Sequence, residues 1–132
     1  MKCLDSSILI DFLKGNDEAV TKIEKMNSNS ICSTIVNLIE VASGIYRKKD
    51  IDHKKHIDRM KILFNELYLL NFNYNSALLS AKINADLVKE GKEIDANDCS
   101  IAGIMLTSGC NTVITRDKEH FERIKGIKVE SY

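Results

Sequence analysis

The sequence predicts an α/β fold, a three-layer α/β/α sandwich with a mostly parallel sheet of about five strands. Short, β-prone apolar segments alternate along the chain with longer segments whose apolar residues recur at helical spacing. Residues that favour helix N-termini follow directly after several of the apolar segments, as in the strand-helix units of parallel sheets. With 132 residues the chain is long enough for one hydrophobic core, so we expect a single domain over residues 1–132.

The composition is that of an ordinary globular protein, with 44% hydrophobic and 29% charged residues. Basic and acidic residues number 19 each, so no overall field favours a nucleic-acid partner and any basic surface must be local. We find no apolar run of about 18 residues and no leader pattern, and therefore expect a cytoplasmic protein without membrane contact. The four cysteines lie in apolar segments without a C-x-x-C pair, which favours buried hydrophobic residues over zinc ligands or disulfides.

The first predicted strand contains Cys3 and Leu4 and leads directly into Asp5. Ser6 and Ser7 suit a helix N-terminus, and apolar residues at helical spacing follow them. Asp5 is therefore expected at the carboxyl end of a strand, where ligand sites lie in open α/β sheets. Two other roles are open for it: a helix N-cap, or a phosphoryl acceptor, although the latter favours a second acid at the position of Ser7.

The next segments repeat the strand-helix order. Gly15 is expected to end the first helix, and Asn16 or Asp17 to cap a second one over residues 18–26. Residues 30–33 are short and β-prone and predict the second strand. A helix connecting two parallel strands is the expected arrangement here.

Thr34 is predicted to cap a third helix that runs to about Lys48. Glu40 lies between Ile39 and Val41 in the most apolar part of this helix. A lone glutamate there carries a desolvation cost unless positive charge meets it, although a solvated glutamate is the commoner case. Its place about two turns beyond a strand end lets it reach back to the same sheet edge as Asp5.

Residues 47–61 form the one strongly basic stretch, with seven Lys or Arg residues against three Asp residues. Such a stretch attracts nucleic-acid phosphates, or it is the solvated face of a helix whose other side is buried. His53 and His56 could share a helix face, but no third ligand lies near them, so a metal role is not expected for this pair.

Residues 66–72 predict a third strand, after which Asn73 or Asn75 opens a long helix that runs to Glu90. This helix carries an apolar stripe, which is typical of either a core or an oligomer interface: Ala77, Leu78, Ala81, Ala85 and Val88.

Asn97 is a predicted N-cap that places Asp98 at the head of a mostly apolar helix ending at Gly109. Helix N-termini favour negative charge, so this position alone does not require a function. Residues 112–115 predict a fourth strand that leads into Asp117, as the first strand leads into Asp5. A short helix and a last strand are expected to complete the chain, over residues 118–124 and 127–129.

Four acids stand at strand ends or on apolar helix faces: Asp5, Glu40, Asp98 and Asp117. If they converge, their negative charges require a counter-charge. Oxygen ligands of this kind bind hard divalent cations such as Mg²⁺ or Mn²⁺, and no His or Cys pattern in the sequence competes in favour of zinc.

The order and spacing of these acids resemble the PIN domain family and, within it, the small VapC-type toxins of toxin-antitoxin pairs. The resemblance covers the chain from Met1 to about Val129 and rests on four stretches: Leu4–Asp11, Glu40 with Gly44, Asn97–Ala102, and Val113–Asp117 with Phe121. The sequence departs from the family pattern in two places: residues 94–96 replace a stretch that often contains proline, and Gly103 stands where alanine is common. Asp95 is an additional acid near the expected site.

The resemblance implies a ribonuclease that hydrolyses phosphodiester bonds in RNA with Mg²⁺ or Mn²⁺. It implies that four residues are both catalytic and metal-binding: Asp5, Glu40, Asp98 and Asp117. Substrate contacts are expected from Ser7, Thr115, Arg116, Lys48 and Lys49. The resemblance also implies a cognate antitoxin protein and a homodimer. The alternative is a non-catalytic RNA-binding or regulatory domain that keeps the fold and uses the acids for structure.

Overall fold

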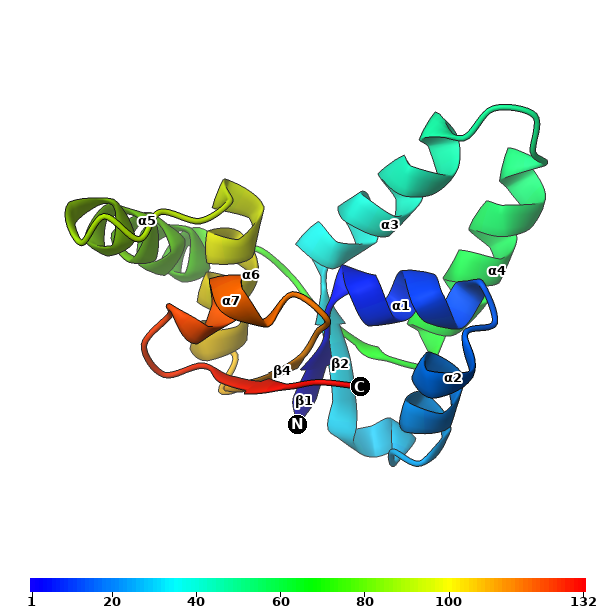
Figure 1. The fold of residues 1–132 in the computed structure, drawn as a ribbon, viewed down its shortest axis with the longest axis horizontal. Helices are drawn as coiled ribbons and strands as arrows, with labels where there is room; N and C mark the ends of the chain where they lie inside the picture. Colours follow the sequence, from blue (N-terminus) through cyan, green and yellow to red (C-terminus); the bar gives the residue numbers. More distant parts are fainter.

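The computed structural model describes all 132 residues, and its centre is a sheet of five strands (Figure 1). The strands lie side by side in the order β3-β2-β1-β4-β5, and every neighbouring pair is parallel. Their bounds are β1 (Lys2–Leu4), β2 (Ile31–Thr34), β3 (Tyr68–Leu70), β4 (Thr112–Ile114) and β5 (Lys128–Glu130). Each strand overlaps a segment in which a strand is predicted, so the expected parallel sheet is confirmed.

Seven α-helices accompany the strands: α1 (Ser6–Leu13), α2 (Asp17–Glu24), α3 (Ile35–Arg47), α4 (His53–Asn65), α5 (Tyr74–Lys89), α6 (Ala96–Thr107) and α7 (Lys118–Glu122). Figure 1 shows α1, α2 and the α3-α4 hairpin on one side of the sheet and α5, α6 and α7 on the other. The predicted three-layer α/β/α arrangement is therefore confirmed. None of the helices combines the length and apolar character needed to cross a membrane.

Successive side chains of the strands point to opposite faces of the sheet, and this explains why helices cover both faces. Leu4 and Ile114 point into the core beneath α1, α2 and α4, whereas their neighbours Cys3 and Val113 point into the core beneath α6 and α7. Successive side chains of a strand face opposite sides, so a strand that is apolar throughout requires helices on both. All four cysteines are buried with free thiols, as expected for small hydrophobic residues.

The N-terminal ends of the helices can be compared with the predicted N-cap residues. Side chains accept a hydrogen bond from the backbone N–H three residues on at three predicted caps: Asn16, Thr34 and Asn73. The prediction for Asn97 is wrong, because α6 already begins at Ala96, with Asp95 in the N-cap position and no side-chain cap bond. Asn97 instead lies within the first turn of the helix, and Asp98 follows it there.

The apolar stripe of α5 is not part of the core. Its five members are all exposed: Ala77, Leu78, Ala81, Ala85 and Val88. The helix instead packs on α6 through a serine face, because Gly103 allows the two backbones to approach closely. A Cβ at Gly103 would lie 2.0 Å from the Ser80 hydroxyl and 2.8 Å from the Ser76 carbonyl oxygen.

The strand order reverses at the centre of the sheet. The chain moves outward from the central β1 to β2 and β3, then returns to the other side of β1 for β4 and β5. Ligands in open α/β sheets bind where the strand order reverses in this way, outside the carboxyl ends of the strands. In this protein that point lies between β1 and β4, where the Asp5 backbone N–H donates to the Ile114 carbonyl at 3.0 Å.

Candidate active site

Asp5 lies directly after β1 at this point and is only 7% exposed. Its Oδ1 accepts a 3.0 Å hydrogen bond from Asn37 Nδ2, and its Oδ2 accepts a 2.7 Å bond from the Thr115 hydroxyl. Although Asp5 occupies the N-cap position of α1, its side chain makes no capping hydrogen bond. The contacts of the carboxylate therefore hold it at the sheet edge and do not serve the helix start.

Glu40 reaches the same edge from the second turn of α3. Its Oε1 accepts a 2.7 Å hydrogen bond from the Ser6 hydroxyl, which itself accepts a 3.1 Å bond from Asn37 Nδ2. The Asn37 side chain is fully buried, and its Oδ1 accepts from the hydroxyl of Thr34. This acceptor role turns the Asn37 amide nitrogen toward Asp5 and Ser6, so one buried amide links the two acids.

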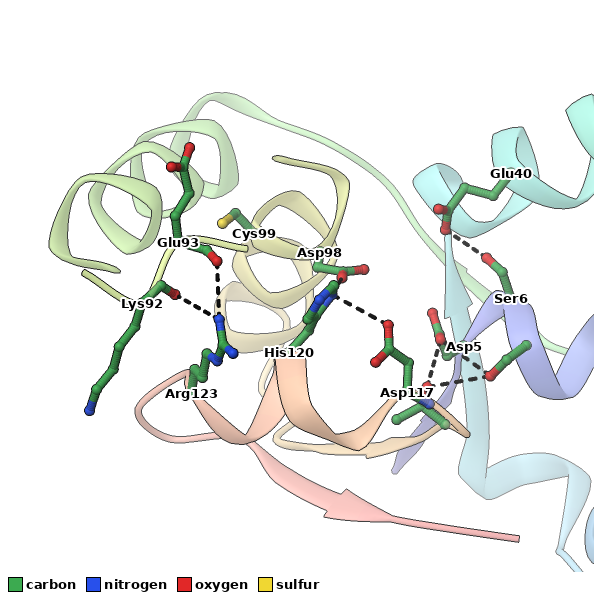
Figure 2. Close-up of polar contacts among 12 residues, drawn as sticks. Asp5, Ser6, Glu40, Lys92, Glu93, Asp98, Cys99, Asp117, His120 and Arg123 are labelled. Atoms are coloured by element: carbon green, nitrogen blue, oxygen red, sulfur yellow. Dashed lines mark hydrogen bonds and ion pairs between the residues drawn. The ribbon is translucent and has the colours of Figure 1, made fainter. Parts of the chain in front are cut away.

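Asp98, near the start of α6, and Asp117, between β4 and α7, approach from the other side of Asp5 (Figure 2). His120 of α7 joins them: its Nδ1 lies 2.7 Å from Asp98 Oδ2 and 3.3 Å from Asp117 Oδ2. One ligand atom from each of these three residues lies within 4.8 Å of the other two. The structure thus gathers the four predicted acids at one edge and adds a histidine to them.

Burial and mutual repulsion make three of the carboxyl groups hard to ionise: Asp5, Glu40 and Asp98. Burial raises the pKa of Asp5 above its usual range, against the hydrogen bonds that it accepts. Burial also raises the pKa of Glu40, and the charge of Asp5 adds to the rise. The pKa of Asp98 reaches about 6 through burial, with the His120 hydrogen bond opposing and the charges of Asp5 and Glu40 adding to the shift. The hydrogen bond to Asp98 in turn raises the pKa of His120.

No Lys or Arg forms an ion pair with any of the four carboxylates, and His120 is their one basic partner. Buried like charges without counter-charge are unfavourable, and a divalent cation would compensate them. Carboxylate oxygens are the donors that Mg²⁺ and Mn²⁺ accept. The donor set at this edge therefore fits a hard divalent cation.

The two hydroxyl groups expected near the site differ in accessibility. Thr115 is fully buried; its hydroxyl donates to Asp5 and accepts a 3.0 Å bond from the Asp117 backbone N–H. It is not available to a substrate, so its predicted substrate contact is replaced by a positioning role. Ser7 is partly exposed, and its hydroxyl accepts a 3.1 Å bond from the Arg116 backbone N–H.

Arg116 extends beside the acids and is held by a buried acid that the sequence analysis did not single out for function. Its guanidinium lies 3.2 Å from Asp11, which is 8% exposed and also accepts a 2.6 Å hydrogen bond from the Tyr132 hydroxyl. The Arg116 side chain itself remains 66% exposed. The structure therefore leaves one anchored positive charge accessible at the rim of the site.

Lys48 and Lys49 do not join the acids. They follow the far end of α3, whose last residue, Arg47, lies about 10 Å along the helix axis from Glu40. Lys48 lines a groove of about 480 Å³ between α1, α3 and α4 whose other polar residues are Lys14, His56 and Arg59. These lysines belong to a separate basic surface.

Several residues at the site were not predicted from the sequence. Asn37 is signalled only by its position three residues after the cap Thr34, where it completes a capping box. His120 follows Asp117 at the three-residue spacing that joins side chains on a helix, but the short α7 made this pattern weak. Asp95 is exposed, and its charge contributes to the raised pKa of Glu40.

The chain is similar to known proteins over nearly its whole length. The PIN domain family model matches residues 2–127. The tRNA(fMet)-specific endonuclease VapC of Salmonella typhimurium is 25% identical, over 98% of this chain and 96% of the relative. Ribonuclease VapC1 of Methanocaldococcus jannaschii is 28% identical, over 96% of this chain and 84% of the relative. A structure of DNA-bound VapBC from Salmonella typhimurium aligns with a TM-score of 0.87 at 24% identity, covering 98% of this chain and 96% of that one. The chain belongs to the PIN domain family.

Proposed function

We propose that this protein is a metal-dependent endoribonuclease that hydrolyses phosphodiester bonds in RNA, and that it is the toxin of a VapBC-type pair. The observation that carries the proposal is the meeting of four carboxylates at the strand-order reversal without a Lys or Arg to pair them: Asp5, Glu40, Asp98 and Asp117. The names of the relatives, ribonuclease and tRNA-specific endonuclease, support RNA as the substrate.

We assign Asp5, Asp98 and Asp117 as ligands of Mg²⁺ or Mn²⁺ and Glu40 as the acid that orients the attacking water. The cation, when bound, would neutralise charge on the phosphodiester and lower the pKa of the attacking water. The protein's own contribution is to fix the acids before substrate arrives. The Ser6 hydroxyl holds Glu40, and the buried hydrogen bonds to Asp5 keep its carboxylate turned outward from the sheet edge.

The RNA backbone would be held by positive charge on two surfaces. Arg116 is anchored by Asp11 and exposed beside the acids, which suits contact with a phosphate near the cleaved bond, and the Ser7 hydroxyl lies next to its backbone. Lys48 and Lys49 lie farther away and suit phosphates of a more distant part of the RNA. A structured RNA large enough to reach both surfaces, such as a tRNA, is the substrate class that we infer.

We propose two protein partners, an antitoxin and a second copy of the chain. The antitoxin is supported by structural neighbours that are VapBC complexes. The homodimer is supported by the apolar stripe of α5, whose Leu78 is 57% exposed. An exposed stripe at helical spacing is typical of a helix that packs on a partner. The free thiols of all four cysteines fit a reducing compartment, and we infer action in the cytoplasm.

The test is cleavage of purified tRNA by the protein with Mg²⁺ or Mn²⁺, with and without EDTA. We expect discrete products that require the metal and that fall by at least about 100-fold in Asp98→Asn, because a ligand is lost. Asp86→Asn is the matched control, since Asp86 lies on α5, is not one of the four acids and pairs only with Lys82. Metal-independent products, or products that persist in Asp98→Asn, would refute the assignment. Binding of tRNA without cleavage would support the non-catalytic alternative.

A further inference from the structure

His120 presents a ring nitrogen to two of the acids at once. Its Nδ1 lies 2.7 Å from Asp98 Oδ2 and 3.3 Å from Asp117 Oδ2, so both oxygens face the same nitrogen atom (Figure 2). None of the hydrogen bonds of the structure joins the ring to any other residue. The ring is therefore directed into the acid cluster and has no second structural role there.

The start of α7 fixes this orientation. Asp117 occupies the N-cap position of α7, and His120 follows it by three residues, which places both side chains on one face. The next residue, Phe121, is fully buried in the core beneath α6 and α7 and anchors the short helix. The backbone of α7 thus fixes the position of the ring. The His120 side chain is 34% exposed, which leaves it open to an incoming ion.

We propose that His120 is a metal ligand through Nδ1, and that with Asp98 and Asp117 it forms a mixed nitrogen-oxygen site that selects Mn²⁺ over Mg²⁺. The inference rests on the proposed function, since it concerns the ion that the acids bind. A neutral imidazole offers one nitrogen lone pair, and Nδ1 carries it when the proton resides on Nε2. Coordination therefore replaces the hydrogen bond between His120 and Asp98.

The preference follows from the ligand chemistry. Mg²⁺ is small, loses its water reluctantly and takes oxygen ligands almost exclusively. First-row transition ions bind imidazole nitrogen as well as carboxylate oxygen, with Mn²⁺ the weakest binder of the series. The neighbouring pair Asp5 and Glu40 offers only oxygen and does not discriminate between the two ions. Selection therefore depends on the one nitrogen, and replacing that nitrogen by a carboxylate oxygen should remove it.

The experiment uses untagged protein and Mn²⁺ alone as the probe. Electron spin echo envelope modulation detects the ¹⁴N nucleus of an imidazole bound directly to Mn²⁺. We expect ¹⁴N coupling in the wild type and its loss in His120→Glu, which supplies oxygen in place of nitrogen. The double variant His53→Gln/His56→Gln removes the other two histidines, which lie on α4, and should keep the coupling. Calorimetry should show that the preference for Mn²⁺ over Mg²⁺ falls by about tenfold in His120→Glu.

The outcomes separate this inference from the proposed function. Bound Mn²⁺ without ¹⁴N coupling, coupling that survives in His120→Glu, or an unchanged ion preference would each overturn the role of His120. If the same protein still cleaves tRNA, the nuclease assignment stands without it. Coupling without cleavage would keep His120 as a ligand and refute the nuclease. A wild type that binds no Mn²⁺ would refute both.

Discussion

The Thr115 hydroxyl donates a 2.7 Å hydrogen bond to Asp5 Oδ2, joining the ends of β4 and β1 where the strand order reverses. Both groups are buried, and the same hydroxyl accepts from the backbone of Asp117. One side chain therefore sets the positions of two proposed metal ligands. The bond also opposes the rise in the pKa of Asp5 that burial causes.

Replacing Thr115 by valine preserves the shape of the side chain and removes its hydroxyl. We expect the free energy of unfolding to fall by about 1 to 3 kcal/mol, because buried Asp5 and the Asp117 N–H lose a partner. Mn²⁺ affinity, measured by calorimetry, should fall as well, since the carboxylate is less well oriented and harder to ionise. Thr112→Val in the same strand is the control. Equal effects of the two substitutions would show that the strand, and not the Asp5 contact, is responsible.

The raised pKa of Asp98 predicts a pH dependence of stability without metal. Its value rises from 3.8 to about 6 in the folded protein, so the folded state binds this proton more tightly than the unfolded state does. The stabilising contribution is fully present below pH 3.8 and is lost as the pH rises through about 6. Asp98→Asn should remove this loss and stabilise the protein at pH 8 by about 2 kcal/mol.

The measurement is urea unfolding in EDTA at pH 5 and pH 8. Asp5 and Glu40 also have raised pKa values, but they remain in both proteins. The difference between wild type and variant therefore reports Asp98 together with His120, whose pKa the hydrogen bond to Asp98 raises. Asp86→Asn should follow the wild type over this range. An Asp98→Asn variant that is destabilised equally at both pH values would contradict the shift and point to lost packing or hydrogen bonding.

Gly103 is required by the close approach of α5 to α6. Gly103→Ala should lower the free energy of unfolding by about 1 to 3 kcal/mol, because the added methyl meets the Ser76 and Ser80 backbone. Gly44→Ala is a matched control in α3, where a Cβ meets nothing within 4 Å, and should stabilise the protein by about 0.5 to 1 kcal/mol. Urea unfolding of both variants decides the point, and a neutral Gly103→Ala would show that the helices can separate at little cost.

The glycine also marks the limit of what the sequence could reveal about α5. Helical spacing predicted the helix and its stripe but left open whether the stripe is covered, because periodicity describes one element and not its neighbours. The covered face proved to be the one with Ser76 and Ser80, because Gly103 has no Cβ and lets their backbone approach α6 closely. Such a packing choice depends on two segments at once.

In the site, too, features of a single segment were predictable from the sequence, whereas contacts between distant segments were not. The strand ends that carry Asp5 and Asp117 were predictable, because apolar runs followed by an acid identify the carboxyl edge of a parallel sheet. The residues that hold these acids were not, since Asn37 and Thr115 each act across the fold on Asp5. His120 was not predicted, because α7 has only five residues and one three-residue spacing in so short a helix gives no periodic signal.

The α5 stripe predicts an interface between two copies of the chain. Leu78→Glu combined with Ala81→Glu should convert a dimer to the 14.9 kDa of one chain in light scattering, because both side chains are exposed on the stripe. Asn75→Glu, also exposed on α5, should leave the mass unchanged. At a protein concentration low enough for the wild type to be monomeric, the unfolding free energy of the double variant should stay within about 0.5 kcal/mol of the wild-type value. A wild type that scatters as a monomer would exclude this interface.

The distance between the lysines and the acids predicts a separation of binding from catalysis. Lys48→Gln combined with Lys49→Gln should weaken tRNA binding and reduce its salt dependence by a slope of about 1.4, as two phosphate contacts are lost. The cleavage rate at saturating RNA should stay unchanged, because both residues follow the end of α3, which extends about 10 Å beyond Glu40. The double variant Lys89→Gln/Lys92→Gln, at and beyond the end of α5, is the control for total charge. An unchanged salt slope would assign the basic surface to solvation, and a lower rate at saturation would mean that these lysines act on the reacting phosphate.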